Sequence, residues 1–136
     1  MANIDKPIPT PTFETRPYWE GCKQRELRIQ RCAACGHNQF FPRLYCTNCF
    51  SDRVEWIKTS GRATVTTFTI VKRPVSPAFA DDVPYVVALV KLDEGPTMMT
   101  NIVGCEPEQV AIGMPVTVTF EDWTEEIAIP KFVPAQ

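Results

Sequence analysis

The alternation of apolar and polar residues predicts a chain built mainly of short strands. Val116, Val118 and Phe120 alternate with polar neighbours, which is the cleanest period-two pattern in the sequence. Strand-like segments are separated by Gly, Pro and Asp residues, and they cover 63–71, 85–92, 97–103, 116–123 and 127–133. In the first of them the apolar phase slips between Val65 and Phe68, which indicates a long bent strand with a β-bulge.

These five strands, with one possible helical turn at 107–110 before the fourth strand, predict a small closed barrel. A five-stranded OB-like barrel is the natural candidate, and the fold class is mainly β. The loop 73–83 has eleven residues and carries Phe79 near its tip. Because long loops inside compact domains are often functional, Phe79 is either a contact residue or a hydrophobic plug that folds back on the barrel.

The N-terminal segment, residues 1–12, carries proline at alternate positions. Pro7, Pro9 and Pro11 forbid a helix and favour an extended conformation. We expect an extended, proline-rich arm that is disordered or lies on a partner, and we favour disorder. The arm therefore contributes no element to the predicted fold.

A short helix is expected within residues 13–26. A cap at position 15 or 16 can begin it, and Pro17 then falls in the first turn, where a missing N–H costs nothing. Tyr18 and Trp19 give this helix a large apolar surface. The two rings either form a docking surface or pack against the rest of the chain. A glycine at position 21 weakens the helix before it ends near 23–25.

Residues 27–60 have the pattern of a metal-bound ribbon. A strand-like segment beginning at Leu27 leads into a first cysteine pair, and another, 54–57, leaves a second pair. So short a ribbon cannot bury much core, so a metal would supply much of its folding free energy. A hinge at positions 60 and 61 separates the ribbon from residues 61–136, the expected OB-fold domain.

The two cysteine pairs are the strongest chemical signal in the chain. They are Cys32 with Cys35 and Cys46 with Cys49, each of the form Cys-x-x-Cys, and ten residues lie between the pairs. Two pairs at this spacing can close a tetrahedral shell of four thiolates around one zinc ion, with iron as the main alternative. A complete shell leaves no position for water or substrate, so we expect a structural metal.

The residues that follow the two pairs differ. Gly36 follows Cys35, where a metal knuckle commonly turns through a left-handed backbone conformation that only glycine enters without steric cost. Phe50 holds the corresponding place after Cys49, so the second knuckle is less ideal by sequence. All four thiolates remain available, and the metal prediction is unchanged.

The net charge of −2 hides an uneven division along the chain. Residues 1–62 contain ten Lys or Arg against six Asp or Glu, a balance of +4, whereas residues 63–136 contain four against ten, a balance of −6. An acidic second half is poorly suited to tracking a nucleic-acid backbone. No apolar run approaches the roughly 20 residues that span a bilayer, and no signal pattern opens the chain. Free thiols at metal spacing favour a reducing compartment, so we expect a cytoplasmic protein.

The remaining reactive side chains favour a helper over an enzyme. His37 is the only histidine and lies two positions beyond a metal ligand, where a surface or metal-adjacent role is expected. Cys22 and Cys105 lie outside the cysteine pairs and are expected to be small buried apolar residues. A catalytic Cys–His pair would have to recruit His37. The sequence has no glycine-rich phosphate loop and no convincing paired-carboxylate motif.

Taken together, these motifs resemble one protein family. They are Tyr18-Trp19, Gly21, Glu26-Leu27, Gln30-Arg31-Cys32, Cys35-Gly36, Pro42-Arg43, Cys46, Cys49, Glu55-Trp56 and Ser60-Gly61-Arg62, then Thr67, Thr69-Ile70-Val71, 84–90, 92–95, 112–116 and Phe120. Over residues 13–134 the chain is similar to acyl-CoA-associated proteins that join an N-terminal helix and a rubredoxin-like zinc ribbon to a C-terminal OB fold. Phe50 and Ala63 stand where glycine is common, and neither departure removes a metal ligand.

The resemblance implies a non-catalytic accessory subunit. Members of this family accompany thiolase-fold enzymes, including acyltransferases, thiolases, condensing enzymes and aldolases, and some are paired with hydratases. We therefore expect structural zinc, a thiolase-fold catalytic partner, and an acyl-CoA thioester shared at the interface. Arg62, Lys72 and Arg73 are the candidates for the CoA phosphates, because we expect them to cluster where the barrel begins.

Two other functions stay open on the sequence. Zinc ribbons and OB barrels also bind nucleic acids, but that function needs a basic groove with aromatic platforms, which the acidic second half opposes. A rubredoxin-like electron carrier would hold iron in the same four-thiolate shell. We expect neither a nucleic-acid nor a membrane partner.

Overall fold

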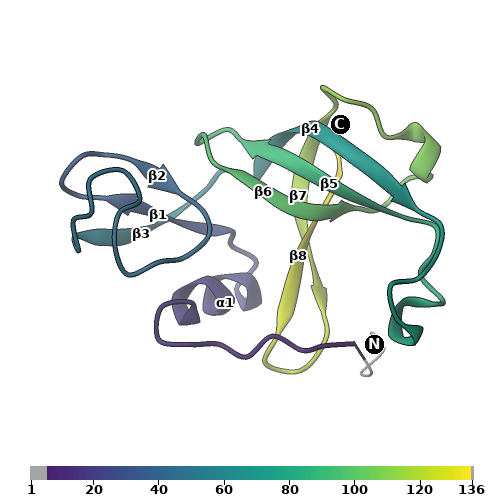
Figure 1. Cartoon of the computed structure of the whole chain (residues 1–136), viewed down its shortest axis with the longest axis horizontal. Helices are drawn as coiled ribbons and strands as arrows, with labels where there is room; N and C mark the ends of the chain where they lie inside the picture. The colour runs from purple at the N-terminus through teal and green to yellow at the C-terminus, as the bar shows by residue number, and fades with distance from the viewer. Residues whose placement is uncertain (1–5, 136) are drawn as a thin grey trace.

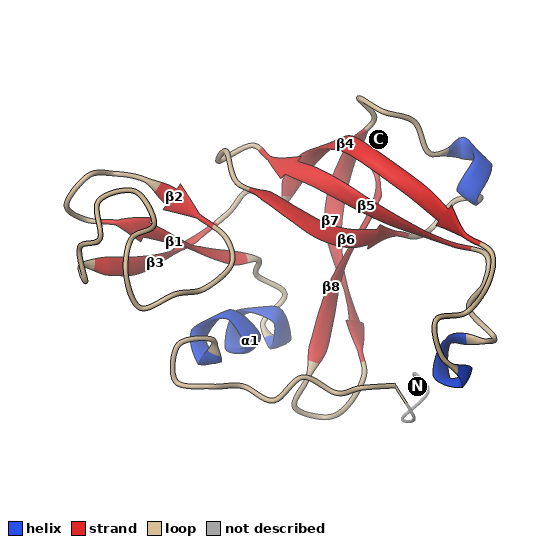
Figure 2. Ribbon diagram, viewed as in Figure 1, coloured by secondary structure: helices blue, strands red, loops and turns tan. Residues whose placement is uncertain are grey.

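The computed structural model describes residues 6–135, and it consists of a small ribbon beside a barrel (Figure 1). The elements are α1 (Arg16–Lys23), β1 (Arg28–Cys32), β2 (Asn38–Gln39), β3 (Val54–Lys58), β4 (Arg62–Val71), β5 (Tyr85–Leu92), β6 (Thr97–Ile102), β7 (Pro115–Asp122) and β8 (Ala128–Pro134), with 3₁₀ turns at Pro77–Phe79 and Pro107–Gln109. Strands dominate and α1 is short (Figure 2). The mainly β fold class is confirmed. No helix within the described range is long and apolar enough to cross a membrane.

The second half forms a closed barrel of five strands in the order β4-β5-β6-β8-β7. Neighbouring strands are antiparallel except β6 and β8, which pair in parallel at Ile102 and Phe132. The register of β4 against β5 shifts between Val65 and Thr67, so the predicted bulge is confirmed. The 3₁₀ turn at Pro107–Gln109 precedes the fourth strand, as the sequence pattern predicted. This arrangement is the OB-like barrel.

The ribbon is a three-stranded antiparallel sheet in the order β2-β1-β3. Helix α1 precedes it, with Thr15 at the N-cap and proline in the first turn. At the C-terminal end, Glu26 N–H donates to Gly21 C=O (2.8 Å) and Arg25 N–H donates to Cys22 C=O (3.1 Å), which is the Schellman pattern. Arg25 occupies the left-handed position, with φ of 63°, and its side chain forms a bidentate pair with Asp122 of β7 (2.7 and 3.0 Å).

One hydrophobic core joins the helix and ribbon to the barrel. Tyr18 is buried against Trp19 and Phe40, with ring centroids 4.9 and 5.6 Å away. It belongs to the same cluster as Phe132, the largest fully buried side chain in the barrel. Because α1 also packs on β8, the packing alternative for the aromatic pair is confirmed, and Tyr18 is not a docking residue.

The connection between ribbon and barrel is fastened by hydrogen bonds. Thr59 donates its N–H and its hydroxyl to Leu27 C=O, both at 2.9 Å, and Ser60 N–H donates to the Glu94 carboxylate (2.9 Å). Gly61 has φ of 81°, and a Cβ at this position would lie 2.8 Å from Val118 Cγ1. The expected hinge is therefore a fixed junction at which only glycine fits.

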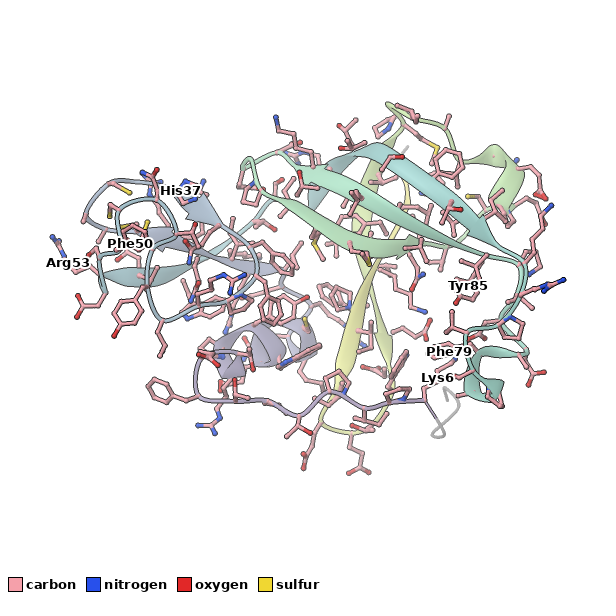
Figure 3. All side chains as sticks on the ribbon, in the orientation of Figure 1. Lys6, His37, Phe50, Arg53, Phe79 and Tyr85 are labelled. Carbon is pink, nitrogen blue, oxygen red and sulfur yellow. The ribbon has the colours of Figure 1, made fainter. Side chains whose placement is uncertain are left out.

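The described part of the N-terminal arm, residues 6–12, runs from helix α1 towards the loop that carries Phe79 (Figure 1), and its buried residue is Lys6. Lys6 is 6% exposed, pairs with Asp82 at 2.7 Å, and lies 5.6 Å from the ring centroids of both Phe79 and Trp123. The prediction of a disordered arm is wrong for this part, because the ammonium group gains an ion pair and two aromatic faces. Residues 1–5 lie outside the described range. Phe79 also contacts Tyr85, so it folds back as the plug alternative proposed (Figure 3).

Candidate metal centre and surrounding surface

Four cysteines from two knuckles come together at the end of the ribbon. Cys32 ends β1 and Cys35 follows in the first knuckle, while Cys46 and Cys49 lie between β2 and β3. The four Sγ atoms lie within 4.8 Å of one another, and the Cys32–Cys49 and Cys35–Cys46 separations are both 3.6 Å. A tetrahedral site with Zn–S bonds of about 2.3 Å places its sulfur atoms ~3.8 Å apart. The spacing therefore fits zinc.

Backbone amides point at the sulfur atoms in both knuckles. Ala34 and Cys35 donate N–H to Cys32 Sγ at 3.3 and 3.4 Å, and Asn48 and Cys49 donate in the same way to Cys46 Sγ at 3.3 and 3.4 Å. Such donors stabilise thiolate over thiol. The two knuckles therefore share one arrangement of backbone donors around their first sulfur atom.

The backbone reverses at equivalent places in the two knuckles. Gly36 N–H donates to Cys32 C=O (2.8 Å) with φ of 81°, and Phe50 N–H donates to Cys46 C=O (2.9 Å) with φ of 64°. The first knuckle thus uses glycine, whereas the second forces a phenylalanine into the left-handed region. The sequence predicted a less ideal second knuckle, and the positive φ of Phe50 is the reason.

The thiols of the cluster differ in pKa. The Asn48 side-chain amide and the His37 backbone lower the pKa of Cys35 to about 6. The pKa of Cys49 is raised to about 12, because desolvation and neighbouring thiols outweigh the Ser51 backbone N–H that lowers it. Neighbouring thiols in one shell ionise one after another. A divalent metal removes this conflict, since it stabilises all four thiolates together.

The three basic residues predicted to bind CoA phosphates are not brought together. Arg62 is the first residue of β4 and pairs with Asp93 at 3.3 Å. Lys72 and Arg73 follow the last residue of the same strand, roughly 30 Å away along an extended backbone. The expected cluster at the start of the barrel does not form, because β4 separates its members. The role in CoA binding stays a prediction for each end separately.

The other potentially reactive side chains, Cys22, Cys105 and His37, lie in different parts of the molecule. Cys22 is fully buried, and burial raises the pKa of its thiol to about 12. Burial also raises the pKa of the half-buried Cys105 thiol. His37 lies in the ribbon, where Nε2 is 3.2 Å from the Thr47 hydroxyl. Among the described residues, the hydrogen bond found for the His37 ring is to Thr47 and not to Cys22 or Cys105.

A buried pair of glutamines in the ribbon escaped the sequence reasoning. Gln30 and Gln39 are 4% and 5% exposed, and Gln39 Nε2 donates to Gln30 Oε1 at 2.9 Å. Gln30 also bonds both Arg43 N–H and C=O at 2.8 Å, and Gln39 bonds Thr47 N–H (2.9 Å) and Tyr45 C=O (3.2 Å). No local pattern distinguishes these from solvent-facing glutamines. Their partners lie in a loop that the pair holds in place.

Two surface features were also missed. A cavity of about 510 Å³ lies beneath the arm, and Lys6, Phe79 and Trp123 contribute to its wall. A second, shallower hollow of about 450 Å³ lies on the ribbon. Four exposed apolar side chains line the ribbon hollow, and we call them the ribbon patch: Phe41, Leu44, Tyr45 and Phe50.

The fold and the thiolate cluster define a zinc ribbon joined to an OB-fold barrel. Residues 19–55 match the family profile described as the rubredoxin-like zinc ribbon domain of ChsH2, and residues 56–121 match the ChsH2 C-terminal OB-fold domain. A protein of Methanothermobacter thermautotrophicus named "DUF35 domain-containing scaffold protein" is 36% identical over 116 residues, which are 83% of this chain and 86% of that protein. The chain belongs to the ChsH2/DUF35 family.

Two longer relatives are named as hydratase subunits. The "Probable enoyl-CoA hydratase alpha subunit" of Thermomonospora curvata is 38% identical over 130 residues, 96% of this chain. The "3-oxo-4,17-pregnadiene-20-carboxyl-CoA hydratase alpha subunit" of Mycobacterium tuberculosis is 39% identical over 119 residues, 85% of this chain. This chain spans 40% and 37% of their respective lengths. It is thus similar to one part of each.

Solved structures agree with the family assignment. The chain is similar to one in a structure titled "Ltp2-ChsH2(DUF35) aldolase", with a TM-score of 0.84 and 38% identity, covering 94% of this chain and 99% of that chain. A DUF35-family protein of Sulfolobus solfataricus has a TM-score of 0.62 at 17% identity and supports the fold alone. Homologues in this family are scaffold subunits that form complexes with other subunits.

Proposed function

We propose that this chain is a non-catalytic accessory subunit of an acyl-CoA thiolase- or acyltransferase-type complex. It braces a thiolase-fold catalytic subunit and helps form the site for the CoA thioester. The names of its relatives support this, since they combine scaffold proteins with subunits of CoA-thioester hydratases and of an aldolase complex. Cysteines at metal spacing support a reducing compartment, and we propose that the complex is cytoplasmic.

The observation that carries this proposal is the separation of the reactive groups. Within residues 6–135, the single histidine lies beside the metal ligands, while Cys22 is sealed in the core and Cys105 lies on the barrel. A nucleophile needs a base within hydrogen-bond reach, and neither thiol has one. The bond-making chemistry is therefore assigned to the partner.

The metal in this proposal is zinc, held by Cys32, Cys35, Cys46 and Cys49. When bound, it supplies folding free energy to the ribbon and no reactive position, because the four thiolates complete its shell. The sulfurs bind, the backbone amides orient them, and the knuckles exclude water from the coordination sphere. Metal analysis should give one zinc per chain and a colourless protein; a red protein with iron would support the electron-carrier alternative.

The experiment is isolation of the complex at native expression, followed by separate expression of the partner. We expect a thiolase-fold protein to co-purify, and we expect it to turn over an acyl-CoA thioester only when this chain is present. The isolated chain should show no turnover. Activity of the chain alone, or equal activity of the partner without it, would refute the proposal.

A further inference from the structure

The ribbon patch gathers four exposed large apolar side chains around one hollow. Phe50 is 79% exposed, Tyr45 57%, Leu44 49% and Phe41 48%. All four line the same hollow, so the exposure is contiguous and not scattered. Contiguous exposed apolar surface marks an interaction site in soluble proteins. Phe50 lies in the part of the ribbon remote from the barrel (Figure 3).

Phe50 adds a second departure at the same place. Its φ of 64° lies in the left-handed region, which glycine enters freely and phenylalanine does not. The equivalent turn of the first knuckle uses Gly36. The left-handed backbone opposes folding of the isolated chain, and the exposed ring buries too little surface to offset that cost. Departures of this kind cluster at binding sites.

The loop that carries the rest of the patch is held rigidly from beneath. The buried amides of Gln30 and Gln39 fix the backbone at Arg43, Tyr45 and Thr47, as described above. The buried glutamines thus hold the backbone of the loop whose apolar side chains face solvent. Such preorganisation lowers the entropy lost on binding.

The charge around the patch indicates the kind of partner. The charged side chains that line the hollow are Arg43 and Glu14, and neither has an ion-pair partner among the described residues. Arg43 is exposed beside Leu44, so a carboxylate on the partner can pair with its guanidinium group at the edge of the apolar surface. Aromatic and arginine side chains together are characteristic of protein interfaces.

We propose that the ribbon patch is the surface that docks the catalytic partner, and that Phe50 is its central anchor. The partner surface presents an apolar groove bordered by carboxylates, which receives Phe50 and Leu44 and pairs with Arg43. The identity of this partner as a CoA-thioester enzyme rests on the proposed function above. The location of the docking surface rests on the exposure, strain and charge of the ribbon.

Two other occupants would cover the same apolar surface. A two-fold contact between copies of this chain would pair Arg43 of one copy with Glu14 of the other. The related structure named "Ltp2-ChsH2(DUF35) aldolase" combines a family member with a different protein, which favours a complex of unlike chains. An anionic lipid surface would attract Arg43 but would be repelled by the acidic barrel half, with its balance of −6. The experiment below distinguishes both occupants from the catalytic partner.

The test uses Phe50→Gly, a substitution that suits the backbone while removing the ring. Because glycine relieves the left-handed strain, the variant should keep its zinc and melt at the same or a higher temperature. The catalytic subunit is first identified by co-purification with the wild-type chain and is then expressed separately. The affinity of Phe50→Gly for this subunit should be about tenfold or more below that of the wild-type chain. Leu44→Ser should weaken binding in the same assay. Ile112→Ser, which removes a 70%-exposed side chain from the barrel half, is the matched control and should leave the affinity unchanged.

The outcomes separate this inference from the proposed function. If Phe50→Gly binds as tightly as wild type while the complex turns over acyl-CoA, the docking surface is wrong and the function stands. If Phe50→Gly loses binding but the partner acts on no CoA thioester, the surface stands and the function is wrong. Self-association, or binding to anionic vesicles, that Phe50→Gly abolishes while partner affinity is unchanged would assign the patch to those occupants and overturn the inference.

Discussion

Arg25 and Phe50 hold left-handed backbone conformations without being glycine, with φ of 63° and 64°. Arg25 is compensated, because its guanidinium forms two hydrogen bonds with Asp122 and the helix end is closed by the Schellman bonds. The turn at Phe50 is closed by the hydrogen bond from its N–H to Cys46 C=O, but its ring is exposed. The same backbone feature therefore closes a helix end at Arg25 and a metal knuckle at Phe50, and the Arg25 side chain is bound by Asp122 whereas the Phe50 ring is left at the surface.

The metal ligands give a pH prediction at the residue scale. The Cys35 thiol has a pKa of about 6, below its ordinary value of 9.0, so ionisation stabilises the folded knuckle fully above pH 9 and this contribution is lost as the pH falls through 6. We expect zinc to be released near the lower end of this interval, as the pH falls towards 6, because protons compete with the metal for the thiolates. A chromogenic chelator would follow the release. Cys35→Ser should release zinc at higher pH than wild type, and Cys105→Ser should match wild type.

Glycine 61 gives a stability prediction with a matched control. Gly61→Ala places a Cβ 2.8 Å from Val118 Cγ1 at φ of 81°, whereas Gly113→Ala has φ of 87° and nothing within 4 Å. Both substitutions place an alanine in a strained left-handed conformation, but only the alanine at position 61 also clashes with Val118. We expect Gly61→Ala to lower the free energy of unfolding by about 2 kcal/mol or more in urea titrations, and Gly113→Ala by roughly half as much. Equal losses would show that the junction tolerates a side chain.

At the scale of elements, the barrel strands were the most predictable part. The segments 85–92 and 97–103 match β5 and β6 closely, because alternation and flanking turn residues are local signals. The bulge in β4 was visible as a slip in phase. What local pattern could not show was that a ten-residue strand carries Arg62 and Lys72 to opposite ends. Sequence proximity had suggested a cluster that the strand geometry pulls apart.

The separation of the basic residues leads to a prediction for CoA binding. Arg62 is already paired with Asp93, whereas no ion pair of Lys72 or Arg73 is found among the described residues. We therefore expect Lys72→Ala with Arg73→Ala to raise the KM of the assembled complex for its acyl-CoA several-fold, with kcat little changed, since phosphate contacts supply uniform binding. Arg62→Ala should have a smaller effect. The reverse order would place the phosphates at the start of β4.

At the scale of the whole molecule, the ribbon and the barrel share one core. Tyr18, Cys22, Leu27 and Ile29 belong to the same buried cluster as the barrel residues. The ribbon is also tied to the barrel through Asp122 and Glu94. Coupling of this kind makes cooperative unfolding the expected behaviour. Metal binding at one end of the molecule therefore stabilises the other.

Metal removal tests this coupling. We expect a strong chelator to lower the thermal midpoint of the whole chain while leaving one transition, because the ribbon cannot unfold without exposing part of the shared core. Circular dichroism, which is dominated by the strands, and tryptophan fluorescence of a Trp123→Phe variant, which reports Trp19 and Trp56, should give the same midpoint. Two separated transitions, with the barrel unaffected by the chelator, would show that the two parts fold independently.

The sequence by itself determined the features that depend on near neighbours. Cysteine spacing defined the ligand set, alternation defined the barrel strands, and Pro17 in the first turn placed the start of α1 after a cap at position 15 or 16. These signals are local because knuckles, strands and caps are completed within a few residues.

Only the tertiary structure decided which side chains face the interior. Lys6 is buried against a loop more than seventy residues away, Gln30 and Gln39 lie inside the ribbon, and Phe50 is left outside. Each outcome depends on contacts between distant segments, where an ion pair or an amide network offsets the cost of burying a polar group. Composition and periodicity carry no record of such pairings, so the docking surface became visible only when the chain was folded.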